Sequence, residues 1–254
     1  TYCENQLKKN TPSVNEMKPL LAAMLNYGAA AQLQLKYKTE QLANVCLQKY
    51  VDQGLLEAQY LSLSWDDTLL DATKTPDPAM CVNFAENNAK RTAKSLILRG
   101  AVVVKTTFAY GVVDGKGSQL PEGGKITVYY WTNSTYEALK NSGQVLTREN
   151  ASYVQTGDQV TANTDATNIA KYGYEYYVEA EGLAARELGE TLYMVAVFTM
   201  ADGTTEYCSG VQTYSPEEYA GKYIPDTSKA ETLRTLLKWM VVYGEYAKNY
   251  FANN

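Results

Sequence analysis

The 254-residue sequence contains no histidine. Histidine is the commonest general base and a frequent zinc ligand, so its absence excludes Ser–His and Cys–His nucleophile pairs and histidine-ligated metal centres. The four cysteines have no Cys-x-x-Cys spacing, and the sequence has no Asp-x-Asp-x-Asp-Gly calcium loop. We therefore expect no metal and no cofactor.

Basic clusters and long apolar runs are missing as well. The chain carries 23 Lys and Arg against 28 Asp and Glu, a net charge of −5, which argues against a nucleic-acid partner. No apolar run approaches the roughly 20 residues that span a bilayer, so we expect no membrane insertion. The first residues, TYCENQLKKN, have no initial Met and lack the layout of a signal peptide, so we expect one module of a longer chain.

A catalytic carboxylate pair is not indicated either. A glycosidase needs two carboxylates facing each other across a cleft, but no spacing among the 28 acidic residues selects such a pair. The glycine-rich stretches DGKG (114–117) and PEGG (121–124) precede no helical pattern, so they are typical of hairpin loops rather than of phosphate-binding loops. The sequence therefore predicts no catalytic residues, and we do not expect an enzyme.

A repeated helical motif occurs near both ends of the chain. MLNYGAAAQ (24–32) and MVVYGEYAK (240–248) carry Met, Tyr, Gly and Ala at matching positions with a constant offset (243 − 27 = 216). Glycine costs roughly 1 kcal/mol relative to alanine inside a helix, so we expect it to serve close helix packing. The predicted packing residues are Tyr27, Gly28, Ala31, Tyr243, Gly244 and Ala247.

Each copy of the motif predicts a helical hairpin. In the first copy, a short helix over 2–9 precedes a long one over 15–36, with a capping-box pattern at Ser13 and Glu16, and Pro19 favours a start near residue 18. In the second copy, Ser215 and Pro216 begin a short helix, and a long helix starts near residue 228. We predict hairpins at 1–38 and 213–254 and a connector at 39–54.

The intervening region, 55–212, has the two-residue period of β-strands. Runs rich in β-branched and aromatic residues include KITVYYWT (125–132) and TLYMVAVFTM (191–200), and turn signals such as ADGT (201–204) separate several of them. Six or seven strands without an intervening helical period predict an antiparallel immunoglobulin-like β-sandwich. The predicted fold class is therefore α+β, with helical hairpins flanking the sandwich.

Tyrosine is frequent, with 22 residues, and strand alternation sorts some of these side chains. In KITVYYWT the alternate apolar set faces the core, which leaves Tyr129 and Trp131 on the opposite face. In KYGYEYYVEA (171–180), Tyr177 lies on the same side as two glutamates. We predict that Tyr129, Trp131 and Tyr177 form an exposed platform for a sugar ring or a protein. Packing under a loop or against a helical hairpin is the alternative.

The cysteines allow two redox states. If they are oxidised, we expect Cys46 to pair with Cys81, because these two flank a connector and are closest in sequence, leaving Cys3 and Cys208 free or joined. Buried free thiols are the alternative.

Part of the sequence resembles a known kind of module. LLAAMLNYGAAAQLQLKYKTEQLAN and YSPEEYAGKYI with TLRTLLKWMVVYGEYAKNYF resemble a helical-hairpin module in secreted and surface proteins of gut-dwelling Gram-positive bacteria. There the module alternates with β-sandwich domains, to which YYVEAEGLAARELGETLYMVAVFTMADGTTEYCSG is similar. The resemblance implies a secreted or cell-surface location and a modular architecture, and it implies no chemistry.

These observations favour a non-catalytic extracellular binding or adhesion module that engages a host or neighbouring macromolecule. A protein is the preferred partner, for example a host glycoprotein or an immunoglobulin. The alternative is a carbohydrate-binding module attached to a polysaccharide-degrading enzyme. A flat aromatic surface on the sandwich would favour sugar, whereas a mixed polar and aromatic patch on helices or loops would favour protein.

Overall fold

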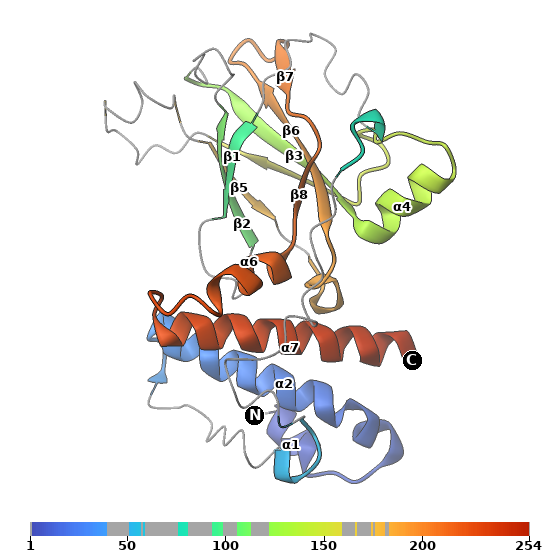
Figure 1. The fold of residues 1–254 in the computed structure, drawn as a ribbon, viewed down its shortest axis with the longest axis vertical. Helices are drawn as coiled ribbons and strands as arrows, with labels where there is room; N and C mark the ends of the chain where they lie inside the picture. Colours follow the sequence, from blue (N-terminus) through green and yellow to red (C-terminus); the bar gives the residue numbers. More distant parts are fainter. Residues whose placement is uncertain are drawn as a thin grey trace. The chain divides into compact units, whose positions relative to one another are not determined.

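The structure is a computed structural model that describes residues 2–39, 51–56, 58, 76–80, 93–98, 106–112, 122–158, 166, 174, 176–180 and 183–253. The chain is α+β, and its sheets are antiparallel (Figure 1). It divides into two compact units. Unit 1 comprises Thr1–Ala72, Ala184–Glu190 and Ser215–Asn254, and unit 2 comprises Thr73–Leu183 and Thr191–Tyr214.

The larger sheet of unit 2 is built around two long strands. β3 (Lys125–Thr132) and β6 (Leu192–Thr199) pair along their whole lengths. β4 (Tyr153–Gly157) pairs with the other edge of β3, while β7 (Glu206–Cys208) and β8 (Gln212–Tyr214) pair with successive parts of the other edge of β6. The strand order is therefore β4-β3-β6-β7, with β8 also on β6.

The turn between β6 and β7 follows the predicted ADGT signal. The Asp202 carboxylate accepts hydrogen bonds from the backbone N–H groups of Thr204 and Thr205, each at 2.8 Å. Gly203 has φ 72°, in the left-handed region that glycine adopts without strain. The hairpin prediction at this position is confirmed.

The inner face of the larger sheet packs against β5. A second sheet contains β1 (Ala93–Leu98), β2 (Thr106–Val112) and β5 (Tyr176–Ala180) in the order β1-β2-β5. Alternate residues of β3 and β6 meet two residues of β5 in one buried cluster: Ile126, Val128, Tyr130, Leu192, Met194, Ala196, Phe198, Tyr176 and Val178. The alternation predicted for KITVYYWT is confirmed on this face, because positions 126, 128 and 130 are all buried.

The outer face of the same sheet is partly covered by a helix that the sequence analysis missed. α4 (Asn133–Asn141) follows β3 directly, whereas we expected no helix among the strands. Thr132 is its N-cap and accepts from Thr135 N–H, and Tyr136 stacks on Tyr193 of β6 with ring centroids 3.6 Å apart. The helix was missed because nine residues are too few to show a clear helical period, and longer strand-like runs precede and follow them in the sequence.

Unit 1 contains the helices at the two ends of the sequence. They are α1 (Tyr2–Leu7), α2 (Pro12–Leu35), α6 (Pro216–Tyr223) and α7 (Glu231–Asn253), with the short 3₁₀ helix η5 (Ala185–Glu187). The predicted N-cap of α6 is confirmed, since the Ser215 hydroxyl accepts from the N–H groups of Glu217 and Glu218. Among the described residues, no helix has the length and apolar character needed to cross a membrane.

The start of α2 differs from the prediction. The helix begins at Pro12, after Thr11 as N-cap, and Pro19 lies inside it rather than in its first turn. The Ser13 capping box does not form, because Ser13 is already helical. Proline is favoured at the first position of a helix, so Pro12 marks the start of α2. We had expected the start near residue 18 because proline is tolerated best in a first turn, and Pro19 does not obey that expectation.

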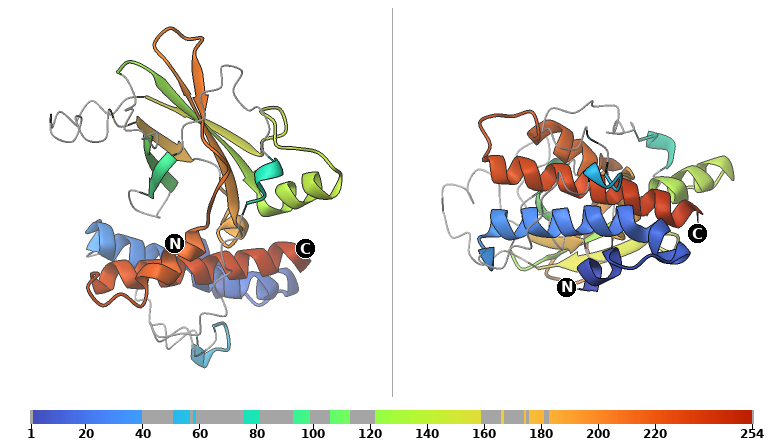
Figure 2. Two further views of the ribbon diagram at one scale, coloured as in Figure 1. Left: turned by 45° about the horizontal axis from the view of Figure 1, so that its top comes forward. Right: turned by 90° about the horizontal axis from the view of Figure 1, so that it is seen from below.

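The long helices α2 and α7 lie side by side and run antiparallel (Figures 1 and 2). Near the end of α2, Gln34 accepts a 2.6 Å hydrogen bond from the Thr232 hydroxyl near the start of α7. In the middle, the rings of Tyr27 and Tyr243 stack with centroids 5.5 Å apart and planes 17° from parallel. The two tyrosines occupy the same position of the sequence repeat, so the repeat copies meet about an approximate two-fold axis.

Candidate binding surface

Trp131 is buried, and the prediction that it is exposed is wrong. Its side chain is fully enclosed in a cluster with Tyr136, Tyr193 and Leu146. The indole N–H donates to Asn150 Oδ1 at 2.9 Å. Alternation placed Trp131 on the correct face of β3, but α4 and the segment after it cover that half of the face. Trp131 therefore contributes to folding and offers no contact surface to a ligand.

Tyr129 lies two residues earlier on the same face of β3, and its side chain is only partly buried. The register places it opposite Val195 of β6 and Val154 of β4. The guanidinium carbon of Arg148 lies 5.8 Å from the centre of the Tyr129 ring. This distance is within cation–π range, so Arg148 covers the tyrosine while leaving part of it in contact with solvent.

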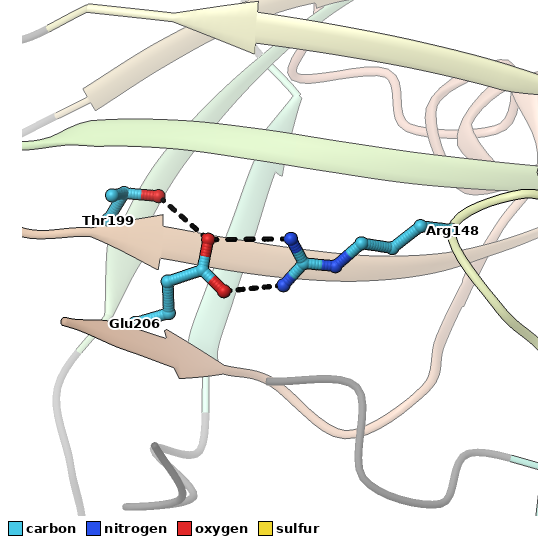
Figure 3. A network of polar contacts seen from close by, with 3 residues as sticks. All are labelled: Arg148, Thr199 and Glu206. Atoms are coloured by element: carbon cyan, nitrogen blue, oxygen red, sulfur yellow. Dashed lines mark hydrogen bonds and ion pairs between the residues drawn. The ribbon is translucent and has the colours of Figure 1, made fainter. Parts of the chain in front are cut away.

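Arg148 also forms an ion pair with Glu206 of β7 (Figure 3). Its two terminal nitrogens donate to the two carboxylate oxygens at 2.5 and 3.4 Å, and the Thr199 hydroxyl donates to Glu206 Oε1 at 3.4 Å. The charged side chains are 36% and 22% exposed, so water screens the pair and its net contribution to stability is about 1 kcal/mol or less. The pair gives the surface two opposite charges in fixed positions.

The surface continues over β3 and β4 as a row of small side chains. Thr127 and Thr156 are cross-strand partners whose hydroxyl oxygens lie 3.0 Å apart, and Val154 is 47% exposed. We call this surface the Tyr129 patch; its members are Thr127, Tyr129, Arg148, Val154, Thr156, Thr199 and Glu206. It combines one aromatic ring, one cation, one anion and small side chains, and such a mixture is typical of protein contact surfaces.

The patch offers groups for contact rather than for metal chemistry. Within the described part of the chain, no three His, Cys, Asp or Glu side chains come together as a metal site. The Glu206 carboxylate is engaged by Arg148 and Thr199, so its oxygens are held in position by two hydrogen-bond donors.

Several predicted residues fall outside what the structure describes. For Tyr177 the backbone is described, opposite Ala109 of β2, but the side chain is not. Cys46 and Cys81 both lie outside the described residues, so their pairing stays a prediction. Cys3 is a buried free thiol, which rules out the alternative in which it is joined to Cys208.

The six predicted packing residues have unequal environments. Tyr27 and Tyr243 stack, and Ala31 and Ala247 are buried. A Cβ built on Gly28 would meet no atom within 4 Å, so the expectation of a close helix contact there is wrong. A Cβ on Gly244 would lie 3.1 Å from Leu188 Cβ and 3.3 Å from the Ala185 carbonyl oxygen, so this glycine packs tightly against η5 and the turn after it.

Sequence reasoning missed Arg148 and Glu206. Glu206 shares its face of β7 with the buried Cys208, so strand alternation gives no signal for an exposed position. Arg148 lies in an irregular segment without any pattern. Their pairing joins residues 58 positions apart, which only the strand order could have revealed.

No family model, curated protein or solved structure matches this chain. Function is therefore inferred from the residues of the surface itself.

Proposed function

We propose that the chain is a non-catalytic extracellular binding or adhesion module whose contact surface is the Tyr129 patch. The observation that carries the proposal is the combination, on one face of the sheet, of the partly buried Tyr129 ring with the partly exposed Arg148–Glu206 pair. Tyrosine and arginine are favoured where proteins bind one another, because both bury a large area while keeping a polar group at the edge.

A protein partner is favoured over a glycan for this surface. A sugar ring stacks best on a flat platform of several aromatic side chains, and burial of Trp131 removes the second ring from the platform that we expected. The opposite charges of Arg148 and Glu206 can instead pair with charged side chains of a partner and set its orientation. Carbohydrate binding at this surface is the alternative.

The proposal includes the architecture implied by the resemblance. The packing of β5 on β3 and β6 supports reading the two sheets as an immunoglobulin-like sandwich. The short and long helix at each end support reading the repeat copies as helical hairpins. In this proposal the chain is one module of a secreted or surface protein of a gut-dwelling Gram-positive bacterium.

Two valine substitutions test the surface. Val154 (47% exposed) lies in the Tyr129 patch, and Val145 (37% exposed) lies outside it in the segment after α4. The wild-type chain is screened by surface plasmon resonance against purified immunoglobulins, host extracellular glycoproteins and a panel of free glycans. For a protein that binds, we expect Val154→Glu to weaken affinity at least about tenfold, because it buries a charge in the contact, and Val145→Glu to have no effect.

Three outcomes would contradict the proposal. They are the absence of binding to any protein on the panel, equal affinity of the Val154→Glu and wild-type chains, and binding to a free glycan that Val154→Glu abolishes. The last result would establish the carbohydrate alternative at the same surface. Thermal melts of both variants check that neither substitution unfolds the chain.

A further inference from the structure

Unit 1 contains an open pocket where the start of α2 lies beside the end of α7. Its volume is about 460 Å³, within the range of small-molecule sites, about 300–1,000 Å³. One wall consists of Glu16, Pro19 and Leu20, which are spaced three and four apart along α2. The other consists of Tyr246, Asn249, Tyr250 and Asn253, which follow the same spacing along α7. The pocket is thus formed by one face of each helix.

The internal repeat supplies a comparison for this pocket within the same chain. At the opposite end of the helix pair, Gln34 and Thr232 are joined by a hydrogen bond. Shifted by the repeat offset, these two positions become Tyr250 and Glu16 (34 + 216 = 250; 232 − 216 = 16), and both line the pocket. The two ends of the helix pair are therefore equivalent by the repeat, and the pocket lies where the opposite end has the Thr232–Gln34 hydrogen bond.

The second copy of the repeat differs from the first at the residues that line the pocket. Where α2 has Ala30, Leu33 and Gln34, α7 has Tyr246, Asn249 and Tyr250. Ala30 is buried in α2, so a small residue satisfies helix packing at that position. The pocket end of α7 therefore carries two phenols and an amide where the equivalent positions of α2 have Ala, Gln and Leu, while the fourth lining residue of α7, Asn253, corresponds to Tyr37.

The chemistry of the lining favours a neutral ligand with many hydroxyl groups. Phenols and amides both donate and accept hydrogen bonds, as hydroxyl ligands require, and four of the five polar lining residues are of these two kinds. The fifth, Glu16, accepts only. The helix dipoles favour neither sign of charge, because the positive end of α2 and the negative end of α7 both lie near the pocket, and an anion would also face Glu16. Tyrosine rings also offer apolar faces to the C–H groups of a sugar.

We propose that this pocket binds a neutral sugar residue of a glycan. Asn249, Asn253 and Glu16 bond the hydroxyl groups, and the tyrosines contribute apolar contact. The Asn253 amide already donates to the Asn249 carbonyl oxygen at 2.8 Å, which restrains its side chain on the last turn of α7. The site is made only of unit 1 residues, so it stands independently of the Tyr129 patch in unit 2.

The test compares repeat-equivalent substitutions in the full chain. Saturation-transfer NMR is recorded with methyl glycosides of glucose, galactose, mannose, fucose, N-acetylglucosamine and N-acetylgalactosamine and with their common disaccharides. Asn249→Leu installs the residue of the first copy, and Leu33→Asn makes the reverse change at the equivalent position. Both positions are exposed, so the two variants are expected to fold.

We expect at least one neutral sugar to bind, its affinity to fall about tenfold in Asn249→Leu through loss of hydrogen bonds, and Leu33→Asn to bind like the wild type. Glu16→Gln, on the opposite wall, is the second variant if Asn249→Leu does not fold, and it should also weaken binding. The proposal is overturned if no sugar on the panel binds, or if the pocket variants bind as well as the wild type. It is also overturned if tetramethylammonium or lysine amide displaces the bound sugar, because the site would then prefer cations.

Discussion

Tyr129 and Trp131 lie two residues apart on one face of β3 and have opposite environments. Trp131 is enclosed by Tyr136 of α4 and Tyr193 of β6, whereas Tyr129 packs at the edge of the same cluster, lies beside the Arg148 guanidinium and is only partly buried. Burial therefore differs between neighbouring positions of one strand face, and the cross-strand partner of Tyr129, Val195, is itself buried.

The burial of Trp131 leads to a stability prediction. Trp131→Ala should lower the free energy of unfolding by about 3–5 kcal/mol, because it leaves a cavity and removes one of the two hydrogen-bond donors to the Asn150 amide oxygen, the other being the Thr147 N–H. Tyr129→Ala should cost clearly less, since its ring is only partly buried. Urea unfolding followed by circular dichroism measures both. Equal losses in the two variants would contradict this difference in burial between Trp131 and Tyr129.

The two glycines of the repeat give a second prediction at the scale of single residues. Gly28→Ala should raise the free energy of unfolding by about 0.5–1 kcal/mol, because the new methyl group meets nothing and alanine favours the helix. Gly244→Ala should gain less or lose stability, because its methyl group presses on Leu188 and the Ala185 carbonyl. Gly244→Leu should cost about 1–3 kcal/mol by overpacking. Thermal melts decide the matter, and equal gains at both alanine sites would refute the assigned role of Gly244.

At the scale of elements, α2 and α7 are held together by repeat-equivalent residues. Tyr27 and Tyr243 stack at the centre of the pair, and burial is the main cause that raises the pKa of each phenol above its ordinary value. The neighbouring Tyr243 raises the pKa of Tyr27 further, and Cys3 does the same for Tyr243. Deprotonation of either ring would place a charge inside the helix interface.

This pairing predicts a loss of stability at alkaline pH. Above pH 10, the ordinary pKa of tyrosine, the unfolded chain releases the Tyr27 proton while the folded chain retains it, so stability falls as pH rises. Tyr27→Phe keeps a stacked ring but has no proton to lose. Between pH 8.5 and 11 the wild type should therefore lose about 1 kcal/mol more than Tyr27→Phe, as measured by denaturant unfolding at each pH. Parallel losses in the two proteins would show that Tyr27 titrates normally.

At the scale of the whole molecule, unit 1 is discontinuous in sequence. It takes its helices from both ends of the chain, and the strands of unit 2 come from the sequence between them. The two repeat copies thus form one helical unit through the α2–α7 contact. The Tyr129 patch and the pocket belong to different units, so the two proposed binding surfaces can be tested separately.

Much of the local structure could be predicted from the sequence. The four helices of the repeat, the inner face of β3, the Ser215 cap and the ADGT turn all depend on residues within a few positions of one another. The helix starts were less accurate, since Pro12 and Pro19 gave competing signals. In the candidate site, Tyr129 was predicted to be exposed, and the structure shows it partly buried. Arg148 and Glu206 were missed, because neither belongs to a periodic pattern.

The sequence by itself determined the α+β class, the repeat, and which side chains of β3 share a face, because propensity and periodicity act over one element. Only the tertiary structure decided that α4 buries Trp131 and that Tyr129 stays partly exposed, that Arg148 pairs with Glu206, and that the equivalent tyrosines of the repeat stack. The physical reason is that burial and pairing depend on which distant element packs against a face. Local patterns specify the face of a strand or helix, and they carry no information about the element that covers it.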